Sequence, residues 1–407
     1  MAYTETTTKS WGSRLGDSIK GIIVGIILFI VSFPLLFWNE GNSVKVAKAL
    51  EEGRGATVEV ADINKIDSAN DGKLVHMTGD ATTQDVLKDA EFGIEYNGMM
   101  LQRNVEFYQW VEKSHEETKK NFGGSETTVT TYTYSKDWCN KPVNSTTFKE
   151  PGHDNIVSYP VSGREQYATN VQYGAFKFTQ DMIEKLSNKK TYSLAEYKIP
   201  AALRGRACVA DKFVYVGRKT AQSATPQVQE PAPQEESCSV SPTDPQIGDV
   251  RITWEVISPK EAVSIVYVQT GDTFTPYHAK SDRSVALLGM GIQSAEQLYE
   301  HAEDMNTLLT WVLRLLGWFL MFCGLNMILT PLSVLGDVVP FIGSLIGGAT
   351  SVVTGLISLT LALITISIAW IWYRPLLGIG LLAAAVFCVY LLFKRRKKPV
   401  PADAERV

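Results

Sequence analysis

The sequence predicts an α+β integral membrane protein, in which one N-terminal and three C-terminal transmembrane helices flank a large β-rich extracytosolic domain. Three observations lead to this prediction. The segment from Leu308 to Phe393 is almost uninterrupted apolar sequence and ends at a basic run, Lys394 to Lys398. A second apolar segment lies at residues 21–38. Between them the apolar residues tend to recur with period two, which is typical of half-buried β-strands.

The composition argues against several classes of protein. The net charge of −4 gives no basis for nucleic-acid binding. The five cysteines are too few for a disulfide-built scaffold, and the three in the polar part, Cys139, Cys208 and Cys238, allow at most one internal disulfide. The catalytic motifs G-x-S-x-G and H-E-x-x-H are missing from the sequence. The sequence therefore predicts no enzyme and no catalytic, metal or cofactor site.

Residues 1–20 are predicted to be a polar cytosolic tail, and residues 21–38 the first transmembrane helix. The alternative is a cleaved signal peptide, whose apolar core is about 7–15 residues long and precedes a small-residue cleavage site. Here the apolar core is longer, about 18 residues, and FWNEG follows it. We therefore favour an uncleaved anchor.

Residues 39–307 are predicted to form the β-rich luminal or periplasmic domain. Its entry, Asn39 to Glu52, shows helical spacing of apolar residues, and most of the rest is typical of strands. The expected strands are residues 57–60, 73–78, 104–111, 127–134, 174–178, 207–216, 249–257 and 263–268, with a short helix at 179–187. Residues 219–246 are rich in Pro and Gln and are predicted to be a disordered insert.

Polar residues divide the C-terminal part. Ser294 and Gln297 have the spacing of a capping box, which predicts a helix start leading toward the membrane. The predicted segments are transmembrane helix 2 at 308–330, an amphipathic or re-entrant segment at 331–348, transmembrane helix 3 at 349–372, transmembrane helix 4 at 376–393 and a basic cytosolic tail at 394–407. Arg314 lies near one end of the second helix, from which its side chain can reach the interface.

Charge sets the expected orientation. Basic residues near the ends of spans resist translocation, so Lys394 to Lys398 place the C-terminus in the cytosol. Counting back through four spans places the N-terminus there too, in agreement with Lys9, Arg14 and Lys20. We therefore expect a multi-pass protein with both termini cytosolic and its large domain luminal or periplasmic.

Small residues recur in the apolar segments at every fourth position, which lets helices approach closely. They are Gly21 and Gly25 in the first segment and Gly343, Gly347, Ser351 and Gly355 near the third. Packing within the four-helix set and an interface between copies of the chain both account for this stripe. Separately, Asn144 begins a glycosylation sequon, which matters only in a eukaryotic host.

Three functional hypotheses remain open. The first is a scaffold that self-associates in the membrane and binds protein partners through the external domain. The second is a channel-forming or channel-regulating protein, with a pore lined by the hydroxyl groups Ser351, Thr354, Ser358 and Thr365. The third is an envelope enzyme with a site in the domain. The motif Gly289-Met290-Gly291 does not indicate a dinucleotide site, because a membrane span follows where a second strand is required.

The chain resembles the transmembrane protein 43 (LUMA) family in several short motifs that occur in order with this span pattern. They are Asn39-Glu40-Gly41, Leu74-Val75-His76, Val105 to Glu112, Gly248 to Arg251, Gly324-Leu325-Asn326 and Tyr373-Arg374-Pro375. The insert at residues 219–246 departs from the family pattern.

The resemblance implies a four-span protein of internal membranes, the endoplasmic reticulum and inner nuclear membrane, that self-associates and organises the nuclear envelope with emerin and lamins. It supplies no catalytic residues. In a bacterial member the emerin and lamin partners disappear, and an inner-membrane homo-oligomer with a periplasmic domain remains. The lipid bilayer is a partner in either case, and nucleic acid is not.

Overall fold

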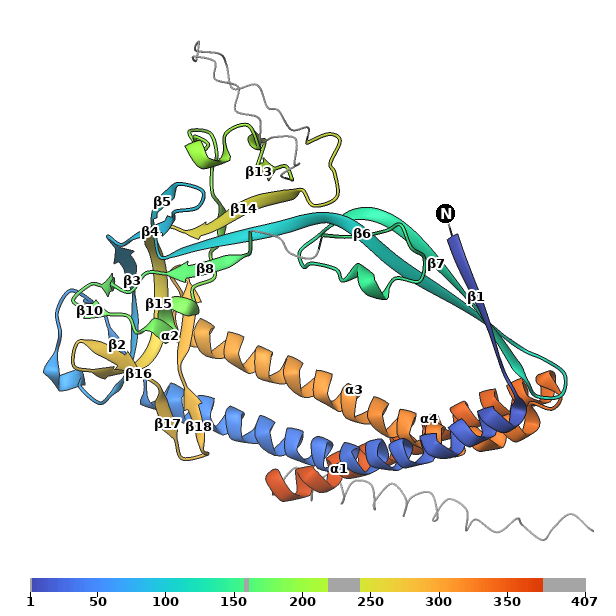
Figure 1. Cartoon of the computed structure of the whole chain (residues 1–407). Coiled ribbons are helices and arrows are strands. Elements are labelled where there is room, and N and C mark those ends of the chain that lie inside the picture. Colours follow the sequence, from blue (N-terminus) through green and yellow to red (C-terminus); the bar gives the residue numbers. More distant parts are fainter. Residues whose placement is uncertain (1, 157–160, 219–241, 376–407) are drawn as a thin grey trace, which may run out of the picture.

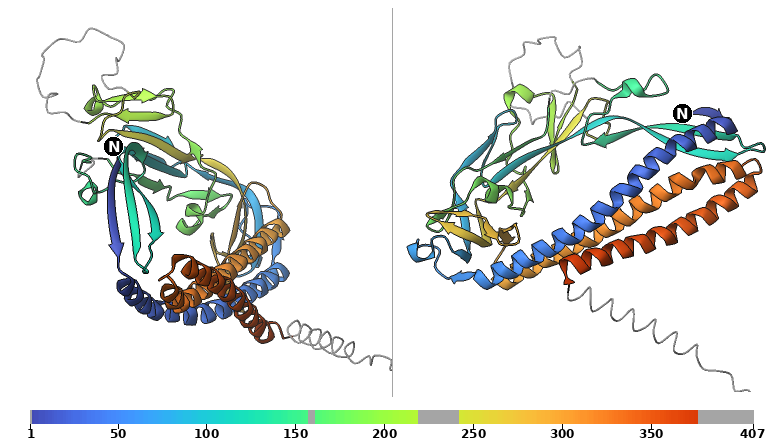
Figure 2. Two further views of the ribbon diagram at one scale, coloured as in Figure 1. Left: turned by 90° about the vertical axis from the view of Figure 1, so that its right-hand side faces the viewer. Right: turned by 90° about the horizontal axis from the view of Figure 1, so that it is seen from below.

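Three long helices and a β-rich body form the protein, and a narrow β-ribbon connects the two (Figure 1). The computed structural model describes residues 2–156, 161–218 and 242–375. The helices are α1 (Trp11–Ala56), α3 (Ala295–Gly336) and α4 (Pro340–Tyr373). All three are long and apolar enough to cross a membrane. They lie side by side, with the β-rich body at one end (Figure 2).

Local sequence signals fix where the helices begin. The Ser10 hydroxyl accepts a hydrogen bond from the Ser13 amide and caps α1. Ser294 and Gln297 form the predicted capping box at the start of α3, with both reciprocal hydrogen bonds present. Pro340 occupies the first turn of α4, where its missing N–H has no helical partner to lose.

The larger sheet has the strand order β1-β7-β6-β14-β13-β12. These strands are β1 (Ala2–Lys9), β7 (Glu126–Cys139), β6 (Met100–Lys120), β14 (Val250–Ile257), β13 (Phe213–Val216) and β12 (Ala207–Ala210). Two short strands, β11 (Lys190–Thr191) and β8 (Arg164–Tyr167), pair with β14 and β6 respectively.

The smaller sheet has the order β10-β9-β3-β15-β16 and joins the body to the helices. Its strands are β10 (Phe176–Lys177), β9 (Val171–Tyr173), β3 (Leu74–Thr83), β15 (Lys260–Thr270) and β16 (Thr273–Thr275), with β2 (Val58–Val60) and β19 (Leu287–Met290) beside them. The remaining elements are the pairs β4 (Val86–Asp89) with β5 (Ile94–Asn97) and β17 (Tyr277–Ala279) with β18 (Arg283–Val285), and the short helix α2 (Gln180–Glu184). The side chains of Leu50 in α1 and Tyr299 in α3 are buried against this sheet.

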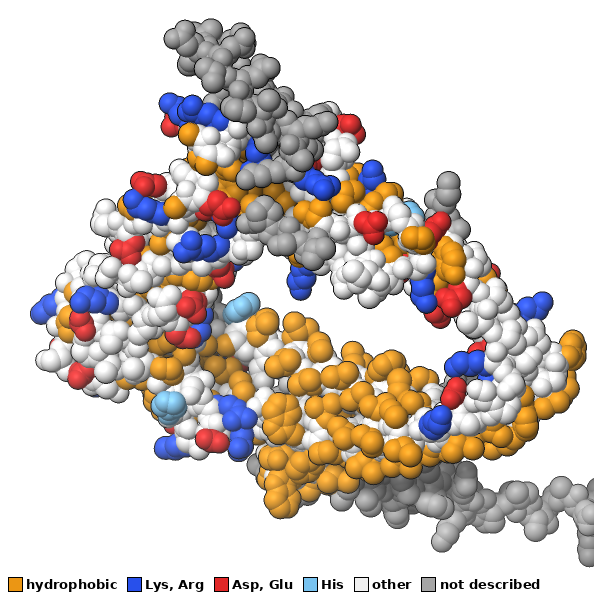
Figure 3. All heavy atoms as spheres, in the orientation of Figure 1, with side chains coloured by type: hydrophobic (Ala, Val, Ile, Leu, Met, Phe, Trp, Pro, Cys, Tyr) orange, Lys and Arg blue, Asp and Glu red, His pale blue; other side chains and the backbone are white. Residues whose placement is uncertain are grey.

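The ribbon consists of β1, β7 and the outer part of β6 from Tyr108 to Lys120. It extends away from the body and reaches the far end of the helices, so that body, ribbon and helices enclose an opening (Figures 1 and 3). β6 and β7 pair without interruption from Phe107 and Cys139 to Lys120 and Glu126. Such an extension needs a partner at its far end to hold one position.

Several expectations change in detail. The polar tail at residues 1–20 divides into β1 and the first turns of α1. The segment at 331–348 is the end of α3, a turn at Asp337, and the start of α4, which continues through the predicted third span. The predicted fourth span at 376–393, the basic tail at 394–407 and most of the insert at 219–246 lie outside the described residues.

The body is centred on a buried polar network. The Asp89 carboxylate accepts hydrogen bonds from the Arg103 guanidinium at 2.9 Å and from the Trp254 indole N–H at 2.9 Å. Both Asp89 and Arg103 are buried, and Trp254 is among the largest fully buried side chains. A buried charge with a partner removed is costly, so this network makes the core specific.

Replacing Asp89 with Ala is expected to lower the free energy of unfolding by about 3 kcal/mol, because the half-exposed Glu91 is then the one carboxylate among the described residues that pairs with Arg103, and Trp254 loses its acceptor. Denaturant unfolding of the full chain in detergent, followed by circular dichroism, measures this loss. Lys88→Ala removes only an exposed pair with Glu95 and is the control, at about 0.5 kcal/mol or less. Equal losses in the two variants would contradict the role of the network.

Candidate functional site: an apolar helix bundle with a charged cluster at each end

A charged cluster joins the far end of the ribbon to the start of α1 and to the turn after α3. We call it the tip cluster, and it consists of Arg14, Lys120, Glu126 and Asp337. The Asp337 carboxylate, in the turn after α3, is fully buried. It accepts hydrogen bonds from Arg14 Nη2 of α1 at 2.5 Å and from Lys120 Nζ of β6 at 2.8 Å. Arg14 also pairs with Glu126 of β7 at 3.2 Å. Four charges from four elements therefore meet at one point.

Backbone contacts reinforce the tip cluster. The Gly123 amide donates to the Val338 carbonyl at 3.0 Å, and the Trp11 indole N–H donates to the Val334 carbonyl at 2.9 Å. Gly124 has φ +80°, and a Cβ at that position would collide with the Trp11 ring. A glycine is therefore required by both its conformation and its close approach to α1.

A second polar cluster lies where the helices approach the body. We call it the inner cluster, and it consists of Glu40, Arg314 and Trp370. The Glu40 carboxylate of α1 accepts hydrogen bonds from Arg314 Nε of α3 at 2.6 Å and from the Trp370 indole N–H of α4 at 2.7 Å. Asn39 also donates to the Thr310 carbonyl at 3.1 Å. Arg314 thus pairs with a buried carboxylate, and its expected position near the membrane interface stays a prediction. The inner cluster fixes the three helices relative to one another.

Most of the exposed helix surface is apolar, apart from charged residues near the tip such as Asp17 and Lys20. Arg14 and Glu40 are separated by 26 positions of α1 (40 − 14), which corresponds to about 39 Å of helix. Figure 3 shows the apolar side chains covering the helices. The most exposed are Ile23, Ile27 and Ile30 of α1, Leu308, Trp311, Leu315 and Phe319 of α3, and Phe341, Leu345, Val352, Leu356 and Trp372 of α4. So extensive an apolar surface requires a lipid or protein environment.

The ribbon beside this surface carries charged side chains on both of its faces, and one face also carries a row of aromatic rings. Side chains alternate along β6, so Lys113, Glu117 and Lys119 lie on one face and Glu116 and Lys120 on the other. β1 adds mostly threonines. An apolar bundle and a polar ribbon therefore run side by side over a similar length.

The glycines singled out from the sequence contact other helices of the same chain. A Cβ at Gly25 would collide with the Gly324 carbonyl of α3, and a Cβ at Gly343 would collide with Asp337. Gly21 lies near Met327, Gly347 near Ser333, and Gly355 near Phe322. The Ser351 hydroxyl donates to Asn326 at 3.2 Å. Packing of α1 and α4 on α3 uses this stripe, and its use between copies stays a prediction.

The other residues named from the sequence are placed as follows. Asn144 is exposed and caps a short 3₁₀ helix, Ser145–Thr147, so its glycosylation in a eukaryotic host stays a prediction. The hydroxyls of Thr354, Ser358 and Thr365 donate to carbonyls of their own helix, α4. This arrangement satisfies each hydroxyl without a water-filled path.

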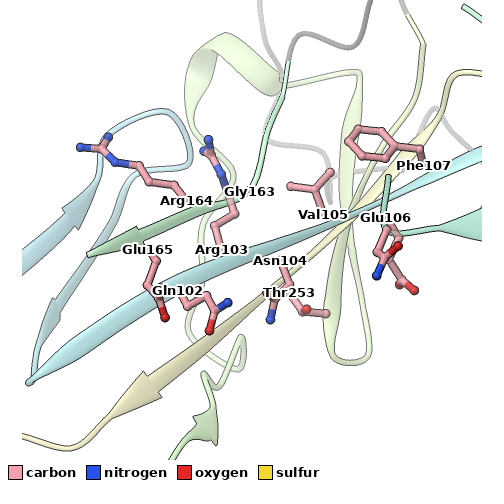
Figure 4. A pocket seen from close by; sticks show the side chains of 11 residues that line it. Gln102, Arg103, Asn104, Val105, Glu106, Phe107, Gly163, Arg164, Glu165 and Thr253 are labelled. Carbon is pink, nitrogen blue, oxygen red and sulfur yellow. The ribbon is translucent and has the colours of Figure 1, made fainter. Parts of the chain in front are cut away.

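A groove in the described body lies along β6 and has a volume of about 690 Å³. Its lining residues come from both faces of the strand, and Figure 4 shows Arg103 and Gln102 directed to opposite sides. Nearby, burial and then a hydrogen bond to Glu165 raise the pKa of Tyr167 to about 12, so the phenol stays protonated near neutral pH. The side chains of this groove do not converge on one point, as a catalytic site requires.

Comparison with known proteins fits these features. The family model "Transmembrane protein 43" matches residues 107–375, which include most of β6, β7, α3 and α4. The chain is 32% identical to mouse Transmembrane protein 43 over 311 residues, covering 74% of this chain and 71% of the mouse protein. This chain belongs to the transmembrane protein 43 family. The human Transmembrane protein 43 is 30% identical over the same shares, and a Drosophila melanogaster homolog is 27% identical over 71% of each chain.

No solved structure matches the chain. Membership in the transmembrane protein 43 family confirms an integral membrane protein, and the structure adds three candidate spans and a β-rich body. Sequence reasoning named Arg14 and Arg314 singly but did not predict that they pair with Asp337 and Glu40. The available signal was that each charge lies within or beside an apolar segment, where an ionised group needs a counter-charge.

Replacing Asp337 with Ala is expected to release the ribbon tip, because buried Arg14 loses its closest carboxylate. At a cost of about 3 kcal/mol, local opening becomes roughly 100-fold more frequent. Hydrogen–deuterium exchange of the amides at residues 119–126 measures this opening. The control is Asp17→Ala, which removes only exposed pairs with Lys9 and Lys20. Unchanged exchange at the tip in Asp337→Ala would show that the cluster does not hold the ribbon.

Proposed function

We propose that this transmembrane protein 43 family member is a membrane-embedded scaffold that self-associates and organises a membrane or its protein complexes. The observation that carries this proposal is the closed frame. The bundle anchors in lipid, the tip cluster holds the ribbon to it, and the smaller sheet packs the body against α1 and α3. A rigid frame of this kind suits a protein whose task is to present surfaces. Protein partners would bind the exposed body.

The ribbon supplies a surface for self-association, because no strand of residues 2–156, 161–218 or 242–375 pairs with either of its outer edges. The amides of Tyr108 and Trp110 donate to Asp249 and Asn155, away from β7. Along an antiparallel pair, the backbone N–H and C=O groups of successive residues point alternately toward the partner strand and away from it. The backbone groups of β6 that turn outward beyond Trp110 are therefore those of Glu112, Ser114, Glu116 and Thr118.

The same reasoning applies to β1 on the other side of the ribbon. Its residues Tyr3, Glu5 and Thr7 lie opposite the β7 residues that turn toward it. Thr4, Thr6 and Thr8 therefore direct their N–H and C=O groups outward, and no other described residue bonds to them.

These two edges are complementary in a second copy. The open edge of β1 presents three outward residues, and the open edge of β6 presents four, at the same spacing. The chain directions of β1 and β6 are parallel, since both are antiparallel to β7. The β1 edge of one copy can thus pair with the β6 edge of the next, which builds a ring or an open row.

Thr6→Pro is expected to abolish assembly through this edge. Proline removes the outward N–H and blocks an added strand, while the bonds from β1 to β7 come from neighbouring residues and remain. Particle mass in lipid nanodiscs, measured by light scattering, should fall to that of one chain.

Thr6→Val is the matched control, because it keeps the N–H and the strand propensity and should assemble like the unaltered chain. A Thr6→Pro protein that still forms the assembly would exclude the edge. An unaltered chain that is monomeric at all concentrations would exclude the scaffold itself.

A further inference from the structure

The two clusters mark where a membrane-spanning α1 meets the two faces of the bilayer. The protein is an integral membrane protein, and α1, α3 and α4 are long and apolar enough to cross. A spanning α1 places its apolar residues 21–38 across the hydrocarbon core, which is about 30 Å thick. Arg14 and Glu40 flank this segment. The tip cluster then lies near one face of the bilayer and the inner cluster near the other.

The ribbon covers the same depth as the spanning helices. It leaves the body, which packs on α1 and α3 beyond the inner cluster, and it ends at Asp337 in the tip cluster (Figure 1). From Tyr108 to Lys120 it advances 12 residues (120 − 108), or about 41 Å. A ribbon held in this way beside spanning helices passes through the whole thickness of the bilayer.

Lipid alone cannot surround such a ribbon. Lys113, Glu117 and Lys119 of β6 are exposed and charged, and charges at that depth are costly unless they face protein or water. No strand of the described residues pairs with either outer edge of the ribbon. Strands at membrane depth are tolerated only where they are buried in protein or line a water-filled cavity. Other copies of the chain must therefore complete the surroundings of the ribbon.

A ring of copies meets this requirement. Copies inserted with the same orientation have ribbons that run in one direction, so the β1 edge of each meets the parallel β6 edge of the next. A closed ring leaves no free edge. At the tip, the ribbon face that carries Lys120 and Glu126 turns toward the helices of its own chain. The opposite face then turns toward the axis of the ring, and the helices lie outside, in lipid.

The face that turns toward the axis is too polar to form a dry core. Side chains alternate along β6, so Lys113, Glu117 and Lys119 share this face, and the paired positions of β7 add Thr127 and Thr133. Symmetry repeats the same lysines around one axis, where they cannot neutralise one another. Charges without partners stay ionised only in contact with water. The interior of the ring is therefore hydrated.

We infer that the assembled protein encloses a water-filled path across the membrane, walled by the ribbons, through which small ions pass. The inference rests on the self-association proposed above and adds an activity to it. The path differs from a pore through the hydroxyls of α4, because each of those is satisfied within its own helix. Rings of charged side chains decide which ions such a path favours.

Lys119→Glu tests the path through its ion selectivity. Lys119 is exposed and forms no ion pair with another described residue, so the change leaves the fold and the assembly intact. The full chain is reconstituted in planar bilayers under a KCl gradient, and the reversal potential is measured. We expect the unaltered chain to conduct, and the variant to shift the permeability ratio several-fold toward K⁺ over Cl⁻. The matched control is Lys212→Glu, an exposed lysine of the body, which should leave the ratio unchanged.

Particle mass in nanodiscs, measured on the same preparations, separates the two proposals. A chain that assembles and conducts no ions would overturn the water-filled path and leave the scaffold standing. A chain that stays monomeric would overturn both. Conductance whose selectivity Lys119→Glu does not alter would mean a path that avoids the ribbon, and this result would also overturn the inference.

Water access to the ribbon provides a second test. Thr133 is exposed and lies seven residues from Glu126 (133 − 126), or about 24 Å along β7. Thr133→Cys, in a Cys139→Ser background that removes a free thiol, should react with a charged methanethiosulfonate in sealed proteoliposomes, and the reaction should lower the conductance. Leu315→Cys on the exposed apolar face of α3 should not react, because lipid covers it. An unreactive Thr133→Cys in the assembled protein would show that the ribbon face is dry and would overturn the inference.

Discussion

The buried carboxylate of Asp337 is the contact on which the shape of this protein depends. It lies 323 positions from Arg14 in the sequence, and it accepts hydrogen bonds from Arg14 and from Lys120. A carboxylate with no solvent contact is stable only when it is paired and fully hydrogen-bonded. The pairing therefore fixes the start of α1, the turn between α3 and α4, and the ribbon tip together. Without it, the far end of the ribbon keeps the direct chain connection from β1 to α1 and the contacts of Trp11 and Gly123, with no paired charge at its centre.

Glu40 is a second buried and paired carboxylate, at the end of the bundle near the body. It binds α3 through Arg314 and α4 through Trp370, so both ends of the bundle are fixed and the three helices keep one alignment. Between the clusters the contacts are made by small residues, including Gly25 against Gly324 and Gly317 against Leu36. There the helix backbones approach each other closely, with no large side chains between them, as in other helix pairs within lipid. The apolar residues are thereby left on the outside of the bundle.

The sequence predicted the elements better than their arrangement. The apolar segments, the capping box at Ser294 and long strands such as β6, β7, β14 and β15 follow from local composition and periodicity. The strand β1 did not, because its polar threonine-rich sequence reads as a tail and its order comes from β7, more than a hundred residues away. For the same reason the charges were found singly and their pairs were not. Arg314 could be expected at an interface, and only the fold shows that Glu40 faces it.

The arrangement of polar and apolar surfaces favours a structural role over a chemical one. In the groove along β6 the side chains diverge, and the hydroxyls of α4 are satisfied within that helix. The buried charges of the two clusters pair with one another and hold the helices and the ribbon together. What is left available is a broad apolar surface and two long open strand edges, and both are surfaces for assembly. Edge pairing would use the ribbon and lipid contact would use the helices, so one chain can do both at once.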